Sequence, residues 1–354
     1  MPQEVTDTSR WCWARARLFS RRSATYTEPS PQPATTTSGY RRKGTSSAQC
    51  LRHWLTFPLT LQETIENLSF DVLLDIFLHC LEGSPQFWPT LVHVCQKWRQ
   101  VVFAFPQTLH LRLYCKHGRP VLKTLGCWPA LPIVIQYGGS PSLDSPSPED
   151  EDNVVAALKQ SDRVCSISLT ITGLLLHKLF LVEEPFSVLE DLVLLSQNPM
   201  GLLLPNTFKW GSPLRRLHSI GIAFPALPQL LFPSIDLVDL QLHEIPGVGY
   251  FSPDAFASAL SGMVQLKYLS LHFLSPASRP NHVGLSPSPG VRVVLPALTH
   301  LKFRGVSEYL NSLVSKIDAP GLVDIEIGFF NQLILRLSQL GQFIDRIEMQ
   351  KSHH

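Results

Sequence analysis

Three short segments of the sequence carry residues typical of catalytic or metal sites, and none completes its motif. Gly247-Val248-Gly249 lacks the third glycine of a dinucleotide-binding loop, and His243-Glu244 lacks the second histidine that a zinc-protease helix places four residues on. Cys115 and His117, with His110 nearby, have no matching pair downstream to complete a metal site. The sequence therefore predicts no enzyme, no cofactor and no metal centre.

Leucine dominates the composition and is unevenly distributed. The chain has 354 residues, of which 56 are leucine, and only one of these lies in the first 50 positions. The 29 prolines argue against long uninterrupted helices. We expect many short apolar elements that together bury a large core. The first 50 residues, which are poor in leucine, are not expected to contribute to this core.

The charge distribution indicates which classes of partner the protein can bind, and the cysteines indicate its cellular compartment. Residues 1–57 carry a net charge of +6, and the remainder carries −4, so the body lacks the basic excess of a nucleic-acid-binding domain. The seven cysteines show no C-x-x-C spacing and follow no apolar leader. The most apolar run, Ile171 to Val182, is too short to span a bilayer. We expect a cytoplasmic or nuclear protein that binds neither nucleic acid nor membrane.

Two short amphipathic helices are predicted within residues 58–106. Apolar residues recur at helical spacing over residues 72–80, after a candidate N-cap at Ser69. A second helix is predicted to start near Pro89 and to carry an apolar stripe as far as Val102. Helices this short are unstable alone and cannot bury all these side chains, so we expect part of the surface to bind a partner protein.

A leucine-rich pattern, L-x-x-L-x-L, recurs along the rest of the chain. Successive copies begin 20 to 32 residues apart, close to the length of a leucine-rich repeat. One copy can start at Leu214 or at Leu217, and we favour Leu217 because the other register buries polar Ser219. Two earlier strands are expected at residues 109–113 and 131–135. The copies are Val164-Ile167-Leu169, Leu189-Leu192-Leu194, Leu217-Ile220-Ile222, Leu237-Leu240-Leu242, Leu266-Leu269-Leu271, Leu298-Leu301-Phe303, Leu322-Ile325-Ile327 and Ile344-Ile347-Met349.

These repeats predict a stacked solenoid, because each unit exposes apolar residues that only its neighbours can cover. The expected fold class is α/β. A disordered basic Ser/Thr/Pro-rich tail (1–57) precedes a helical domain (58–106) and an irregular leucine-rich-repeat solenoid (107–350), which has an acidic loop insertion at 138–152. Only five residues follow the last copy at Ile344–Met349, so we expect an uncapped terminal repeat that is sensitive to proteolysis.

Residues 66–105 resemble an F-box. Leu68–Phe77 is similar to the opening block of that family, and Leu91–Arg99 is similar to its second block, L-x-x-V-C-x-x-W-R. The arrangement downstream, through Trp128–Pro132, Asp162–Cys165 and the repeats, is similar to that of F-box proteins of basidiomycete fungi.

The resemblance implies a non-catalytic subunit of a ubiquitin ligase. An F-box docks on a Skp-type adaptor, which joins a cullin–RING ligase, while the repeats hold the protein substrate. The positions that would form or support the adaptor surface are Leu68, Leu73, Ile76, Phe77, Val94, Cys95 and Trp98.

Substrate binding is expected on strand residues that alternate with the buried leucines, because successive side chains point to opposite faces of a strand. A basic patch is predicted across two adjacent repeats, and an acidic or phosphorylated peptide is its expected ligand. Its residues are Tyr268, His272, His300, Lys302 and Arg304.

A second interpretation of the function remains open, because the F-box-like segment departs from the family pattern at its start. The family usually has Leu-Pro where this chain has Leu68-Ser69. The chain would then be a leucine-rich interaction scaffold with a degenerate F-box that does not assemble into a ligase.

Overall fold

The computed structural model describes most of the chain from residue 67 onward, together with one N-terminal strand. Contacts between residues divide the chain into two units, Ser20–Leu111 and Met1–Phe19 with Arg112–His354. In the described part, no helix is long and apolar enough to cross a bilayer. The described residues are 12–17, 67–117, 121, 125–126, 128–137, 148–179, 184–196, 198, 201–205, 208–211, 213–224, 226–275, 292–330, 335 and 337–351.

The smaller unit is helical. Ser69 is the N-cap of its first helix, as predicted, and the apolar spacing that follows buries Leu73 and Phe77 completely. Trp88, Val101 and Val102 are also buried in this core. The elements are α3 (Phe70–Leu81), the 3-10 turn η1 (Pro85–Phe87), α4 (Trp88–Leu91) and α5 (Gln96–Ala104).

The single second helix predicted from Pro89 onward is wrong, because the chain breaks it into α4 and α5. Cys95 is extended, with φ −155° and ψ 172°, and serves as the N-cap of α5. The break allows Leu91 and Val92 to be buried while Val94 points outward. In one continuous helix, Leu91 and Val94 would lie on the same face, because they are three residues apart.

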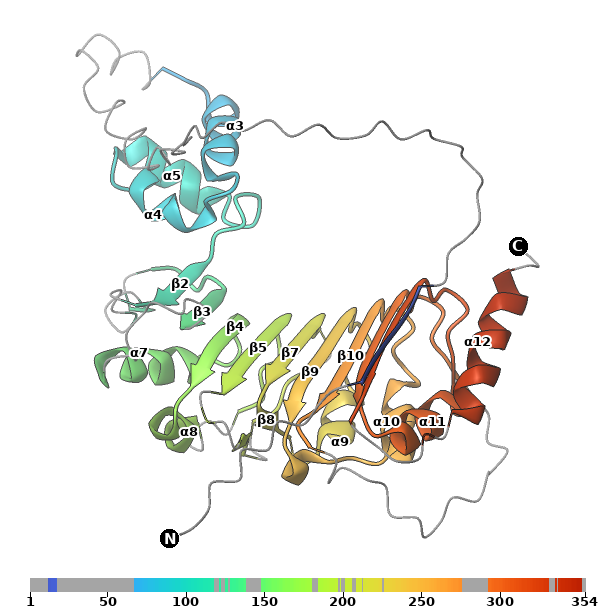
Figure 1. Cartoon of the computed structure of the whole chain (residues 1–354). Helices are drawn as coiled ribbons and strands as arrows, with labels where there is room; N and C mark the ends of the chain where they lie inside the picture. The colour runs from blue at the N-terminus through green and yellow to red at the C-terminus, as the bar shows by residue number, and fades with distance from the viewer. Residues whose placement is uncertain are drawn as a thin grey trace, which may run out of the picture. The chain divides into compact units, whose positions relative to one another are not determined.

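The larger unit is a mixed α/β structure built on a ten-stranded sheet (Figure 1). Strand order is β1-β14-β12-β10-β9-β7-β5-β4-β3-β2, and every neighbouring pair is parallel except the antiparallel pair β1–β14. The strands are β1 (Cys12–Arg17), β2 (Leu113–Lys116), β3 (Ile133–Tyr137), β4 (Val164–Ile171), β5 (Asp191–Ser196), β7 (Arg216–Ile220), β9 (Asp239–Ile245), β10 (Tyr268–Phe273), β12 (His300–Gly305) and β14 (Asp324–Phe329).

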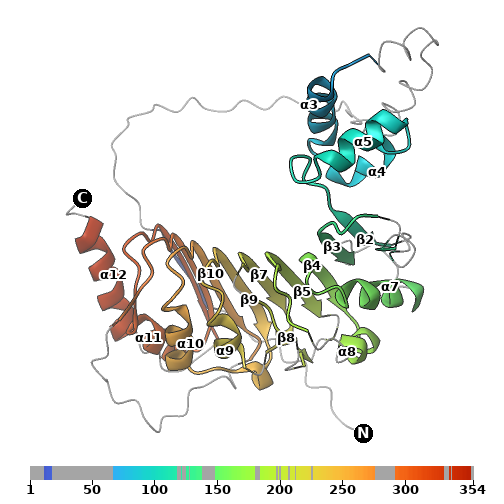
Figure 2. The same ribbon diagram turned by 180° about the vertical axis from the view of Figure 1, so that it is seen from behind.

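Helices and turns line one face of this sheet, as the front and back views in Figures 1 and 2 show. In this layer α9, α10, α11 and α12 contact one another in chain order. The elements are α7 (Pro148–Leu158), α8 (Gly173–Leu179), α9 (Leu227–Leu231), η2 (Gly247–Gly249), α10 (Pro253–Leu260), α11 (Ser307–Val314) and α12 (Ser338–Lys351), with two short strand pairs, β6 (Leu202–Leu203) with β8 (Ile222–Ala223) and β11 (Val293–Val294) with β13 (Ile317–Asp318).

Seven of the eight predicted leucine-rich copies coincide with sheet strands. In six of these strands the predicted second and third template positions are in register with those of the neighbouring strands, so that apolar rows run across the sheet. One such row is buried throughout and consists of Ile167, Leu192, Leu217, Leu240, Leu269, Leu301 and Ile325.

The favoured register of the third copy is wrong. Leu214 is fully buried, and Leu217 pairs with Leu192 and Leu240 in the second template position. Ser219 then occupies the third position and is 1% exposed, whereas Ile220 lies partly exposed on the opposite face. Alignment with both neighbouring strands outweighs the cost of one buried hydroxyl.

This register makes a testable prediction about stability. Leu214→Ala should lower the free energy of unfolding by about 2–5 kcal/mol, because it opens a cavity in the core. Ile220→Ala should cost about 1 kcal/mol or less, because its side chain is already partly in water. Urea unfolding of the two variants measures both, and the reverse order of effects would restore the rejected register.

The two early strands begin later than predicted. His110 has a φ of 48° within a turn, and the amide of Leu109 donates to the carbonyl oxygen of Phe105 at 3.0 Å, so β2 starts only at Leu113. The expected loop at 138–152 is also partly wrong. Pro148–Asp152 forms the start of α7, and residues 138–147 lie outside the described part.

The eighth copy is wrong, because residues 344–349 belong to helix α12 rather than to a strand. Leu340, Phe343 and Ile347 are its buried residues, at helical spacing, whereas Met349 is 61% exposed. The helix packs on α11 at the end of the row of helices, so the expectation of an uncapped, protease-sensitive repeat loses its basis.

Candidate functional site

The helical unit exposes a group of apolar side chains on and beside α3. Phe70 is 50% exposed, Val72 41%, Ile76 38% and Val94 49%. Their neighbours in sequence, Leu73 and Phe77, fill the core, so the exposed residues cannot turn inward without displacing them. Large apolar side chains exposed on so small a unit are typical of protein-binding surfaces.

The seven predicted adaptor-binding residues divide into three environments. Leu73 and Phe77 have no exposed surface and support the site from within. Ile76 and Val94 are exposed and available for contact. The remaining three, Leu68, Cys95 and Trp98, are partly buried.

Trp98 joins the core to this surface. Its ring packs edge-on against Phe77, with 4.8 Å between centroids. Its indole Nε1 is buried, and within the described part of the chain no acceptor lies within hydrogen-bonding distance of it. Trp98 therefore links the core residue Phe77 to the partly exposed surface of α5.

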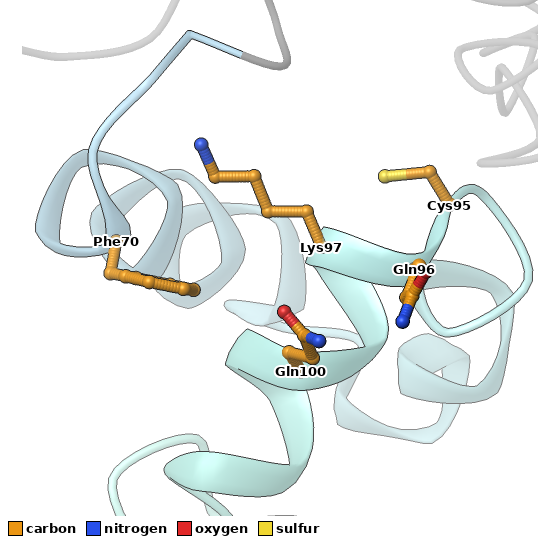
Figure 3. A pocket seen from close by; sticks show the side chains of 5 residues that line it. All are labelled: Phe70, Cys95, Gln96, Lys97 and Gln100. Carbon is orange, nitrogen blue, oxygen red and sulfur yellow. The ribbon is translucent and has the colours of Figure 1, made fainter.

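An open hollow of about 530 Å³ lies beside these residues, and Figure 3 shows its lining. The ammonium of Lys97 donates to the carbonyl oxygen of Leu68 at 2.6 Å and lies 5.7 Å from the centroid of the Phe70 ring. Sequence reasoning omitted Phe70 and Lys97 from the site, although both stand within the two F-box-like blocks. The lining residues are Phe70, Cys95, Gln96, Lys97 and Gln100.

The predicted substrate-binding residues all come together on one face of β10 and β12. Tyr268 pairs with His300, and His272 pairs with Arg304. The alternating residues, such as Leu269 and Leu271, are buried on the opposite face. The rings of Tyr268 and His300 are stacked at 5.8 Å.

The patch is less basic than predicted. The Lys302 ammonium lies 3.1 Å from the Glu326 carboxylate and 5.9 Å from the centroid of the Tyr268 ring. Burial, assisted by the nearby charge of Arg304, lowers the pKa of His272 to about 4, so this ring is neutral at pH 7. Of the patch residues, Lys302 is a cation paired with a carboxylate, His272 is neutral, and Arg304 is a second cation.

Two further histidines extend the patch along the sheet. The rings of His243 and His272 are stacked, with 4.2 Å between centroids and 10° between planes, and His218 meets His243 edge-on at 5.3 Å. His218 was missed because the wrong register of β7 hid its alignment with the neighbouring strands. The Ser270 hydroxyl lies 2.9 Å from Nε2 of His243.

The cysteine and histidine group near β2 does not form a reactive site. The Cys115 thiol is fully buried, 3.7 Å from the Tyr137 hydroxyl, and burial raises its pKa to about 12. A thiol held protonated in this way is a poor nucleophile. His117 instead contacts Asp150, with 3.1 Å between Nδ1 and Oδ2. In the described ranges, no three His, Cys, Asp or Glu side chains are grouped so that they can ligate a metal ion.

Comparison with known proteins gives no match to a protein-family model, to a curated protein or to a solved structure.

Proposed function

We propose that this protein is the substrate-recognition subunit of a Skp-adaptor/cullin/F-box-type ubiquitin ligase. The observation that carries the proposal is the apolar surface of the helical unit, where Ile76 and Val94 are exposed at F-box-like positions. The same segments supply Leu73 and Phe77 to the core, so each block serves both folding and docking. A Skp-type adaptor is the partner that this surface would bind, and a cullin–RING ligase would join through the adaptor.

We further propose that the sheet of the larger unit is an irregular leucine-rich-repeat solenoid. Its support is the recurrence of a buried leucine just before successive strands, as at Leu214, Leu237, Leu266 and Leu298. Helices lie along one face of the sheet (Figure 1). Polar side chains of β9, β10 and β12, which alternate with the buried leucines, are partly exposed on the other face. That polar face is the natural place to hold a protein substrate.

In this role the protein performs no chemistry of its own. It positions a lysine of the substrate near the ubiquitin-charged enzyme, and this proximity replaces a bimolecular encounter with an effectively intramolecular one. The compartments we propose are the cytoplasm and the nucleus.

Affinity purification of the tagged full chain from fungal cells, followed by mass spectrometry, tests this function. We expect the Skp-type adaptor and a cullin in the purified complex, together with a candidate substrate. A stable partner complex that lacks both ligase components would instead support a leucine-rich interaction scaffold with a degenerate F-box, an alternative favoured by Ser69 in place of the usual proline.

The backbone at Ser69 leads to a prediction that separates these alternatives. Its φ of −68° and ψ of 162° are values that proline also adopts. Ser69→Pro should therefore raise the free energy of unfolding by up to about 1 kcal/mol, by restricting the unfolded chain. Calorimetric titration with the adaptor should show equal or tighter binding.

Ser84→Pro is the matched control. Ser84 has a φ of −144°, which proline cannot reach, and its amide donates to the carbonyl oxygen of Leu81 at 3.0 Å. This change should destabilise the unit by about 3 kcal/mol or more. Equal destabilisation by the two substitutions would show that the backbone at Ser69 cannot accept the proline that the F-box family usually has at this position.

A further inference from the structure

A row of side chains crosses the polar face of the sheet near the carboxyl ends of its strands. Leu195 pairs with Ile220, Ile220 pairs with His243, and His272 pairs with Arg304 on the next strands. All five side chains are partly exposed. The row therefore changes from apolar on β5 and β7 to polar and cationic on β10 and β12.

The two central histidines lie on the neighbouring strands β9 and β10. Leu242 pairs with Leu271, so His243 and His272 follow at adjacent positions on the same face. Their imidazoles stack there, with 4.2 Å between ring centroids. The pairing then shifts between Leu271 and Phe273, and Glu244, with a φ of 53° in the left-handed region, takes the extra position of a β-bulge.

The hydroxyl of Ser270 lies beneath the histidine pair. It is 2.9 Å from Nε2 of His243 and 3.4 Å from Nε2 of His272, and the serine is fully buried. A single hydroxyl can donate only one proton, so at least one imidazole nitrogen of the pair must act as the donor to it. The pair is therefore held in place from below while its outer edges remain accessible.

Charged and titratable groups from five strands face this cluster. Burial and then the neighbouring His272 lower the pKa of His243 to about 4. Burial also lowers the pKa of His218, and the charge of Asp239 partly offsets this effect. Lys302 opposes protonation of both stacked rings, and Glu326 favours that of His272. The charged and titratable groups around the cluster are His218 on β7, Asp239 and Glu244 on β9, Tyr268 on β10, Lys302 and Arg304 on β12, and Asp324 and Glu326 on β14.

We propose that this row binds an extended segment of the substrate protein, with an apolar side chain against Leu195 and Ile220 and a carboxylate side chain between His272 and Arg304. The inference rests on the proposed substrate-binding role of the sheet and specifies the ligand.

A singly charged carboxylate suits this site better than a phosphate. The charged residues of β5, β7, β9, β12 and β14 are three cations, Arg216, Lys302 and Arg304, and five carboxylates, Asp191, Asp239, Glu244, Asp324 and Glu326. A dianion would meet more repulsion there than a monoanion. The stacked imidazoles, 4.2 Å apart, also accommodate one proton far more easily than two.

The spacing of the row sets the spacing of the segment. Adjacent strands lie about 4.8 Å apart, so Ile220 is about 12 Å from a point between His272 and Arg304. An extended chain rises about 3.3 Å per residue, and side chains on one face recur at every second residue. The apolar residue should therefore precede the acidic residue by four positions.

Binding of the carboxylate should be coupled to uptake of a proton. In the free protein both stacked imidazoles are neutral at pH 7, because their pKa values are lowered to about 4. A bound carboxylate favours the protonated imidazole and raises its pKa. Affinity should then increase as the pH falls towards the raised value, because only the complex takes up the proton.

The test uses the full chain and the peptide acetyl-Ser-Ile-Ser-Gly-Ser-Glu-Ser-amide, with histidine ring signals followed by NMR. We expect binding about fourfold tighter at about pH 5.5 than at about pH 7.5, with shifts at His243 and His272. Replacing the glutamate of the peptide by glutamine should weaken binding about tenfold and remove the pH dependence. Replacing it by phosphoserine should give no gain.

Substitutions in the protein locate the effect. Arg304→Gln should weaken binding of the peptide about tenfold, and His272→Asn should remove the pH dependence. His177→Asn, at an exposed position of helix α8 outside the sheet, should change neither. The proposal is overturned by absence of binding at about 5 mM peptide, by pH-independent binding, by equal loss in His177→Asn, or by tighter binding of the phosphopeptide. Because no adaptor is present, these outcomes are independent of whether the F-box-like unit docks.

Discussion

Ile76→Asp combined with Val94→Asp is expected to weaken binding to the Skp-type adaptor by at least about 100-fold, which corresponds to about 2.7 kcal/mol. Both side chains are substantially exposed, at 38% and 49%, so the substitutions leave the core intact. In a complex, however, two carboxylates would lose water without gaining a partner, and this desolvation costs several kcal/mol. Calorimetric titration with purified adaptor measures the loss.

The matched control carries the same two charges elsewhere. Val248 is 73% exposed and Val323 is 53% exposed, and both lie in the larger unit. Val248→Asp combined with Val323→Asp should leave adaptor binding unchanged, and both double variants should unfold at the wild-type temperature. If the Ile76 and Val94 double variant binds within about threefold of wild type, this surface is not the docking site.

Phe343→Ala should cause the largest loss of stability among single substitutions at the C-terminal end, about 3–5 kcal/mol. Phe343 is fully buried in α12, and Ile347, one turn on, is 1% exposed. The guanidinium of Arg346 also bonds Asp318, with 2.9 Å from Nε to Oδ1, and reaches the carbonyl oxygen of Val314 at 3.2 Å. Helix α12 thus packs against α11 and covers apolar residues at the C-terminal end of the larger unit. Loss of the phenyl ring would leave a cavity between the two helices.

Met349→Ala on the same helix is the control. Its side chain is 61% exposed, so truncation should change the free energy of unfolding by less than about 0.5 kcal/mol. Urea unfolding followed by tryptophan fluorescence and circular dichroism measures both variants. If Phe343→Ala were as mild as Met349→Ala, α12 would be an appendage rather than part of the core.

The parallel strands could be predicted because the leucine pattern and the buried rows have the same period. Leu240 and Leu269, for example, each stand in the second template position and pair in the sheet. The pattern failed where one residue broke it, as Ser219 did by placing a hydroxyl in an apolar row. It failed again over residues 344–349, because apolar residues three apart also suit a helix, and only the burial of Phe343 distinguishes the two.

The functional surfaces could be predicted less completely, because they depend on where each helix begins and on how neighbouring strands align with one another. The exposure of Ile76 and Val94 follows from where α3 and α5 begin, and the break at Cys95 has no strong sequence signal. The place of His218 in the histidine cluster depends on the register of β7, which alternation along a single strand does not reveal. Charge was also misjudged, because burial and a partner carboxylate neutralise much of the patch that the sequence shows as basic.

The most direct test of the central claim is titration of the intact purified protein with a purified Skp-type adaptor. A one-to-one complex with a dissociation constant below about 1 μM, equivalent to about −8.2 kcal/mol, is the predicted result. No detectable binding at about 50 μM adaptor, with both proteins folded, would contradict the proposed function.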